Sequence, residues 1–200
     1  MNQISAATIW IEGGEGPSTY LWRLSHALDR ILDSRWFYQT GCFNALCPGF
    51  VQVHRKYYLG QAYGNFWAKK NRNLTHILVH RDKATGHWWV IHLGYWPEKL
   101  FTEFGGGANS VQFGGWTYGY PDGMSPPMGT GYFPTTNNLK QSGFFLNLKY
   151  VDDLGVLQDA HRLRQVADIS NCYDAIYLGH KNRVNEQILT FGGPGGQCDL

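Results

Sequence analysis

The residues of this chain that could do chemistry include eight histidines, four cysteines and fifteen carboxylic acids. No acid or thiol joins the histidines at the spacing typical of a zinc site. No G-x-S-x-G sequence surrounds a serine, and Gly105-Gly106-Gly107 lacks the Lys-Ser/Thr pair of a phosphate-binding loop. We therefore expect neither a metal nor a cofactor. The histidines on or beside predicted strands are His54, His76, His80, His87 and His92.

The four cysteines occur as a close pair, Cys42 and Cys47, and a distant pair, Cys172 and Cys198. No histidine at finger-like spacing completes a zinc site, so two disulfides are the better interpretation. Disulfides indicate an oxidising compartment, and the glycosylation sequon that begins at Asn73 agrees with secretion. The amino terminus has neither the basic nor the apolar region of a signal peptide. We interpret the chain as a fragment or a truncated form of a longer secreted precursor.

Composition and charge exclude several classes of partner. The chain is 43% hydrophobic with a formal net charge of +2, which describes one globular domain long enough to bury a substantial core. The basic clusters at residues 54–56 and 69–72 are short, and the net charge is too small for strong attraction to phosphates. We expect no nucleic-acid partner. Because no run of about 18 apolar residues occurs, we expect no membrane-spanning segment.

The elements that must position any site are predicted to be mainly strands joined by glycine-rich turns. Aromatic residues make up 16% of the chain and 25 residues are glycine, a combination that favours pleated strands and tight turns. Residues 75–80 and 87–92 flank a turn-like loop at 82–86, which predicts a β-hairpin. The pattern predicts an all-β fold, an antiparallel β-sandwich of two sheets. The other predicted strands span residues 5–11, 51–59, 110–113, 116–120, 144–150 and 187–191, with one helical turn at 96–101.

One segment near the amino terminus departs from this strand pattern. Apolar residues recur at helical spacing between Tyr20 and Leu32, and Ser18 or Thr19 is available as an N-cap. We therefore predict one short amphipathic helix over residues 20–32, with its leucine stripe packed against the rest of the domain.

The segment from Thr40 to Gln52, T-G-C-F-N-A-L-C-P-G-F-V-Q, resembles the T-G-C-(YF)-N-x-x-C-x-G-F-V-Q signature of the neprosin family of plant glutamic peptidases. Further blocks follow in the family's order and extend the resemblance over residues 40–198. We predict a neprosin-like β-sandwich core over residues 40–200 and a divergent amino-terminal part over residues 1–39, within one domain. The blocks are G-H-W-W at 86–89, G-Y-W-P-E-K-L-F at 94–101, F-G-G at 113–115, M-G-T-G-Y-F-P at 128–134, N-C-Y-D at 171–174 and G-G-P-G-G at 192–196.

The resemblance implies two antiparallel sheets whose concave face carries the active site. It implies the bridges Cys42–Cys47 and Cys172–Cys198 and a secreted or vacuolar location. It also implies glutamic endopeptidase activity near proline, in which one carboxyl activates a water and another protonates or polarises the substrate. Like charges at close range push the two pKa values apart, so that both roles can coexist.

The position of the second glutamate is occupied by a tryptophan. In the family this glutamate directly follows W-G-G on a strand that faces the cleft, whereas here residues 113–115, F-G-G, are followed by Trp116. An indole can neither exchange a proton at working pH nor accept a hydrogen bond. Glu103 or Asp122 could compensate, but both lie in turn-like sequences typical of solvated surface charge.

The first glutamate has two alternative alignments. Family members place it in an I-(EQ)-A-G-W-like strand about thirty residues before the T-G-C block, and I-E-G-G at residues 11–14 has that spacing, which nominates Glu12. Alternatively, residues 6–11 correspond to the preceding family strand. In that alignment the predicted helix at residues 20–32 replaces the strand with the catalytic acid, and Glu12 is an exposed turn carboxylate.

Two functions remain open from the sequence. The favoured one is a catalytically degenerate relative that keeps an aromatic cleft for peptide or protein ligands, proline-rich ones among them, because loss of one member of a cooperating pair removes several orders of magnitude in rate. The alternative is an active glutamic, prolyl endopeptidase that uses Glu12 and a non-standard second acid. Large aromatic residues also form cores. The cleft candidates are Trp88, Trp89, Tyr95 and Trp96, beside Trp116.

Overall fold

The computed structural model describes residues 3–13, 20–25, 49–59, 76–91, 93–101, 106–119, 123–136, 138–180 and 187–198. In this part of the chain strands dominate, and every strand pair with a defined register is antiparallel. The prediction of an all-β antiparallel protein is confirmed. The described strands are grouped in four sheets, so the two-sheet sandwich stays a prediction. Neither of the two described 3₁₀ helices has the length or apolar character to cross a bilayer.

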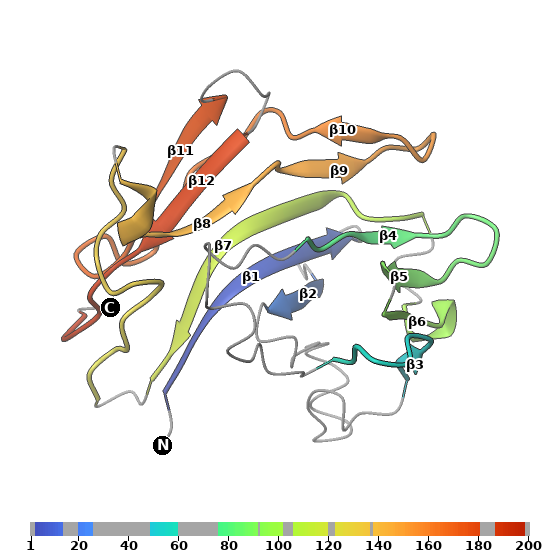
Figure 1. The fold of residues 1–200 in the computed structure, drawn as a ribbon, viewed down its shortest axis with the longest axis horizontal. Coiled ribbons are helices and arrows are strands. Elements are labelled where there is room, and N and C mark those ends of the chain that lie inside the picture. Colours follow the sequence, from blue (N-terminus) through green and yellow to red (C-terminus); the bar gives the residue numbers. More distant parts are fainter. Residues whose placement is uncertain are drawn as a thin grey trace. The chain divides into compact units, whose positions relative to one another are not determined.

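The chain divides into two compact units, each described here by itself. The first joins Met1–Trp10 to Val111–Leu200, and the second is Ile11–Ser110. Strands β1 (Ile4–Gly13) and β7 (Ser110–Tyr118) contribute residues to both units. With β2 (Tyr20–Ser25) they form a sheet in the order β2-β1-β7 (Figure 1).

The helix predicted over residues 20–32 is wrong in its first half, because Tyr20–Ser25 is the strand β2. The segment contains Tyr20 and Trp22, which suit strands, and it pairs with β1. Backbone pairing with a neighbouring strand therefore overrides the helical spacing of the leucines. Residues 26–32 lie outside the described part of the chain.

The second unit contains a four-stranded sheet in the order β3-β6-β5-β4, with bounds β3 (Val51–Gln52), β4 (Val79–Arg81), β5 (Trp88–Val90) and β6 (Gly94–Trp96). The predicted hairpin is confirmed, since β4 and β5 pair directly. Its loop ends at Gly86, whose φ of +68° favours glycine. The predicted helical turn is the 3₁₀ helix η2 (Glu98–Leu100), which begins after Pro97.

Alternate residues of this sheet form the core of the second unit. Trp88 and Val90 of β5 are buried with Trp96 of β6, and Leu59 and Phe101 complete the cluster. The predicted strand at 51–59 ends at Gln52. The chain turns there because the His54 ring nitrogen Nδ1 accepts hydrogen bonds from the backbone N–H groups of residues 56 and 57, at 3.0 and 2.9 Å.

The first unit contains a sheet in the order β11-β12-β8 and the hairpin β9-β10 (Figure 1). The predicted strand at 144–150 is divided at Asn147, whose φ is +56° and whose N–H donates to the carbonyl of Gln187 at 2.9 Å. Strands β10 and β11 were not predicted. The bounds are β8 (Gly143–Leu146), β9 (Lys149–Val151), β10 (Leu157–Asp159), β11 (Asp174–His180) and β12 (Gln187–Gly192), with the 3₁₀ helix η4 (Leu139–Gln141) before β8.

A disulfide closes the carboxy-terminal part of the first unit. Cys172 and Cys198 are bonded, with Cα atoms 5.9 Å apart, which confirms the pairing that the resemblance implied. Beside them the buried Tyr173 hydroxyl donates to the carbonyl of Pro126 at 2.7 Å. Cys172 and Tyr173 share a buried cluster with Met128 and Phe191. Cys42 and Cys47 lie outside the described residues.

Candidate functional site

The glycine pair before Trp116 fixes the direction of its side chain. A Cβ atom on Gly115 would lie 2.1 Å from Sδ of Met128 and 2.7 Å from a ring carbon of Phe191, so this position tolerates no side chain. Phe113, two residues earlier on β7, packs on the core of the same unit. Because side chains alternate along a strand, Trp116 points to the face of β7 away from that core.

Aromatic rings gather on this outward face of β7. Trp116 is half-buried and stacks with Tyr118, whose ring centroid is 6.2 Å away. A Cβ atom on Gly114 would lie 3.4 Å from the ring of Trp10, so glycine leaves room for that indole. We call Trp10, Trp116 and Tyr118 the Trp116 face. Position 116 is thus held on a strand and away from the core, but β7 carries no carboxyl group.

Glu12 is held near the start of β7. Its Oε2 accepts a hydrogen bond from the Ser110 hydroxyl at 2.6 Å, and its backbone carbonyl accepts one from the Asn109 N–H at 2.7 Å. Glu12 is partly buried and belongs to the same continuous strand β1 as residues 6–11. Ser110 is the first residue of β7 and Trp116 the seventh; six residues of extended strand span about 20 Å.

A second group of aromatic rings lies on the face of the four-stranded sheet opposite its core. The register aligns His80 with Trp89, Trp89 with Tyr95, and Tyr95 with Val51. The rings of Trp89 and Tyr95 are 4.6 Å apart. The His87 ring stacks almost parallel on Tyr95, at 4.8 Å and 9°. We call His87, Trp89 and Tyr95 the aromatic row.

The other two cleft candidates lie on the core side of this sheet. Trp88 is 8% exposed and Trp96 is 6% exposed, and both belong to the hydrophobic cluster of the second unit. Of the four candidates on this sheet, therefore, Trp89 and Tyr95 are the two that a ligand could touch. Figure 1 shows the short strands β5 and β6 that carry them.

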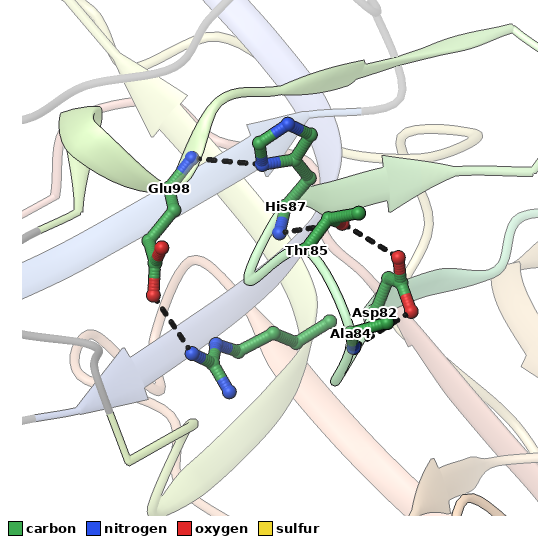
Figure 2. A network of polar contacts seen from close by, with 6 residues as sticks. Asp82, Ala84, Thr85, His87 and Glu98 are labelled. Atoms are coloured by element: carbon green, nitrogen blue, oxygen red, sulfur yellow. Dashed lines mark hydrogen bonds and ion pairs between the residues drawn. The ribbon is translucent and has the colours of Figure 1, made fainter.

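A polar network joins His87 of the aromatic row to η2 and to the hairpin loop (Figure 2). Arg81 donates to Oε1 of Glu98 at 3.1 Å, and the Glu98 N–H donates to Nδ1 of His87 at 3.2 Å. In the hairpin loop Asp82 accepts the Thr85 hydroxyl at 2.5 Å and the N–H of residue 84 at 3.2 Å. The hydrogen bond from Thr85 is the main reason that the pKa of Asp82 lies below its usual value.

The family model named Neprosin matches residues 1–194 of this chain. The chain belongs to the neprosin family. The match includes the amino-terminal residues that precede the motif blocks, so β1 and Glu12 fall inside the matched region. Family membership places the chain among peptidase-like proteins, and Trp116 lies in the same matched region.

Sequence reasoning missed the polar part of the site. The sequence predicts only that His87 lies beside a strand, whereas its bond to Glu98 joins residues 11 positions apart through the turn at Pro97. The only available signal was the adjacency of His87 to two tryptophans and of Glu98 to a proline. Several predicted site residues lie outside the described part of the chain: Cys42, Cys47, Asn73, Glu103 and Asp122.

Proposed function

We propose that this chain binds proline-containing peptide segments through its aromatic residues and has lost most or all peptidase activity. The observation that carries the proposal is the tryptophan at position 116. The family resemblance assigns a catalytic glutamate to this position, and the alternation of β7 turns the side chain away from the core. An indole offers stacking surface and an N–H donor but no exchangeable acid.

The place of Glu12, the candidate acid within the described residues, supports the loss of catalysis. Two carboxyl groups in one site are needed so that one acts as a base and the other as an acid. Glu12 bonds to the Ser110 hydroxyl, whose position on β7 is six residues before Trp116. The family resemblance assigns the second carboxyl to position 116, where this chain has an indole, and residues that act as a unit lose nearly the full rate together.

The aromatic row supports the binding part of the proposal. Trp89, Tyr95 and His87 are all partly exposed and in ring contact. Aromatic grooves recognise proline-rich segments because the pyrrolidine rings stack on them and the extended backbone is already ordered. Because proline has no N–H, its backbone offers acceptors only. The indole N–H, phenol and imidazole groups of the row supply donors for those carbonyls.

The peptidase part of the proposal is tested with the purified chain and a proline-containing peptide at acidic pH, with cleavage followed by mass spectrometry. We expect no cleavage, or cleavage several orders of magnitude slower than an intact two-carboxyl site would give. We also expect Trp116→Glu alone to restore none, because Glu12 is held at Ser110, six strand residues or about 20 Å from position 116, and the two carboxyls could not reach the same water.

Two outcomes favour the alternative of an active endopeptidase. Efficient cleavage by the unmodified chain would overturn the proposal and direct mutagenesis to Glu103 and Asp122. If Trp116→Glu gained cleavage after proline and a further Glu12→Gln change abolished it, Glu12 would be the surviving catalytic acid. A matched Trp116→Gln variant controls for removal of the indole, since glutamine is isosteric with glutamate but does not titrate.

We further propose a secreted or vacuolar location. The Cys172–Cys198 bridge supports it, because structural disulfides persist in oxidising compartments. Non-reducing peptide mapping of protein from its natural source should recover this bridge together with Cys42–Cys47. Four free thiols in that material would contradict the location.

A further inference from the structure

His87, just before β5, accepts a hydrogen bond from the 3₁₀ helix that follows β6. The 3₁₀ helix η2 begins after Pro97 and has no side-chain cap from Pro97 itself. Its first N–H, that of Glu98, donates to Nδ1 of His87 at 3.2 Å. A nitrogen that accepts an N–H cannot carry a proton, so this contact requires a neutral imidazole with its proton on Nε2.

The same imidazole supports the aromatic row. It stacks on Tyr95 at 4.8 Å with an interplanar angle of 9°, and Tyr95 in turn contacts Trp89 at 4.6 Å. The backbone of His87 is fixed as well, because its carbonyl accepts the Asp82 N–H at 2.8 Å and its N–H donates to the Thr85 hydroxyl at 3.3 Å. One ring therefore couples η2 to the rings proposed to bind ligand.

Both carboxylates near this ring already accept hydrogen bonds from other groups. The Glu98 carboxylate pairs with Arg81 at 3.1 Å, and Figure 2 shows it directed away from the imidazole. The Asp82 carboxylate accepts bonds within its own loop. The titratable and charged groups on the elements packed around His87 are His80 and Arg81 on β4, Asp82 and Lys83 in the loop, Tyr95 on β6, and Glu98 and Lys99 on η2.

We propose that His87 is a positioning residue that holds Tyr95 and η2 in the binding arrangement only while its ring is neutral, so that acidification weakens ligand binding. Protonation places a second N–H on the ring. Two N–H groups then face each other at the Glu98 contact, and the cap is lost. Histidine is the side chain whose charge changes between about pH 5 and pH 8. The predicted effect on ligand binding rests on the proposed function, whereas the hydrogen bond between His87 and Glu98 can be tested without it.

The capping contact is tested on the unmodified protein by two-bond ¹H–¹⁵N correlation spectra of the histidine rings and by the amide shift of Glu98. At about pH 7.5 we expect His87 as the Nε2–H tautomer, and on acidification the Glu98 amide should shift together with the His87 ring. An Nδ1–H tautomer at neutral pH, or a Glu98 amide that ignores the His87 titration, would overturn the proposal.

The effect on binding is tested by titrating a terminally capped polyproline peptide at about pH 7.5 and about pH 5. Loss of one hydrogen bond predicts a dissociation constant about two- to tenfold weaker at the lower pH. In His87→Asn the amide oxygen, bonded to Cγ like Nδ1, still accepts the Glu98 N–H but cannot titrate, so binding should become independent of pH. His80→Asn removes the neighbouring histidine and should leave the pH dependence intact.

The experiments distinguish failure of the peptide-binding function from failure of the role of His87. If the spectra show the predicted tautomer and coupling but no peptide binds at either pH, the binding function fails and the capping contact stands. If the peptide binds equally at both pH values, or if His80→Asn abolishes the dependence while His87→Asn keeps it, His87 is not the group that controls the aromatic row.

Discussion

Trp88 and Trp89 are neighbours in the sequence, but they have opposite surroundings in the folded chain. Trp88 is 8% exposed and packs with Val90, Trp96 and Phe101. Trp89 is partly exposed and touches Tyr95 on the other side of the sheet. The difference comes from the pleat, which sends successive side chains to opposite faces. Identical residue types on one strand can therefore serve stability and recognition separately.

The two faces also differ in the polarity of the groups beside the tryptophan. The core face combines Trp88 with apolar residues such as Val90 and Leu59. The open face combines Trp89 with Tyr95 and His87, which have polar atoms at their edges and stay in reach of water. A face of rings with polar edges is suited to a ligand that brings apolar rings and backbone carbonyls.

The largest expected effect is that of Trp88→Ala on stability. Removing this ring leaves a cavity in the cluster of the second unit, and large-to-small changes of this kind cost about 3–5 kcal/mol. Urea denaturation followed by tyrosine and tryptophan fluorescence measures the change. We expect a lower midpoint and weaker binding only to the extent that the protein unfolds.

Trp89→Ala is the matched control on the opposite face. We expect a loss of stability of about 1 kcal/mol or less and a loss of polyproline affinity of about tenfold or more, because aromatic anchors dominate binding energies. If Trp89→Ala destabilised the protein as much as Trp88→Ala, the open face would be buried in the functional protein and the comparison would fail.

The hairpin and the opposite orientation of the two tryptophans can be predicted from the local sequence, but which tryptophan is buried cannot. The hairpin was predictable because alternating residues flank a loop that ends in glycine at Gly86. Alternation also requires that Trp88 and Trp89 face opposite ways. Which of them is buried depends on Leu59 and Phe101, which are distant in sequence from β5. The same limit explains the error at Tyr20–Ser25, where pairing with β1 outweighs helical spacing.

The candidate site was predictable to a similar extent. The position of Trp116 follows from the F-G-G motif, and the close approach of Met128 to Gly115 gives the physical reason for its second glycine. The Glu12 carboxylate accepts a hydrogen bond from Ser110, 98 residues away, and no local sequence pattern predicts such a bond. The cap that His87 provides to Glu98 was missed for the same reason.

Gly86→Ala tests whether the hairpin loop helps to hold Glu98 beside the open face. We expect a loss of stability between those of the Trp88 and Thr85 variants. The backbone there has a φ of +68°, and a Cβ atom would lie 2.3 Å from Cδ of Glu98. The conformational strain of about 1–2 kcal/mol should therefore come with displacement of the Glu98 carboxylate from Arg81. We expect a lower urea midpoint and an altered Glu98 amide shift.

Gly155→Ala is the control for strain alone. Gly155 also has positive φ, +80°, but a Cβ atom there would meet nothing within 4 Å. The difference between the two variants measures the collision with Glu98. Equal losses would mean that the Glu98 side chain moves aside at no cost and that the open face does not depend on its position.

The smallest expected effect is that of Thr85→Val on the pH dependence of stability. The pKa of Asp82 is lowered mainly by the Thr85 hydroxyl and then by the N–H of residue 84. A carboxyl whose folded-state pKa is depressed contributes stability above its unfolded pKa, and this contribution is lost as the pH falls through the folded pKa. Without the hydroxyl, the Asp82 pKa should rise toward its ordinary value and the acid-sensitive part of the stability should shrink. Because the carboxyl lies at the surface, solvent keeps the change small.

Carboxyl ¹³C titration by NMR measures the Asp82 pKa directly, and thermal unfolding at neutral and acidic pH measures its consequence. Thr85→Ser keeps a hydroxyl at Oγ and should keep the low pKa, which separates the hydrogen bond from the loss of the threonine methyl. The hydroxyl also accepts the His87 N–H at 3.3 Å, so Thr85→Val should slightly perturb the His87 ring as well. If the Asp82 pKa were the same in both variants, the hydroxyl would not be the group that lowers it.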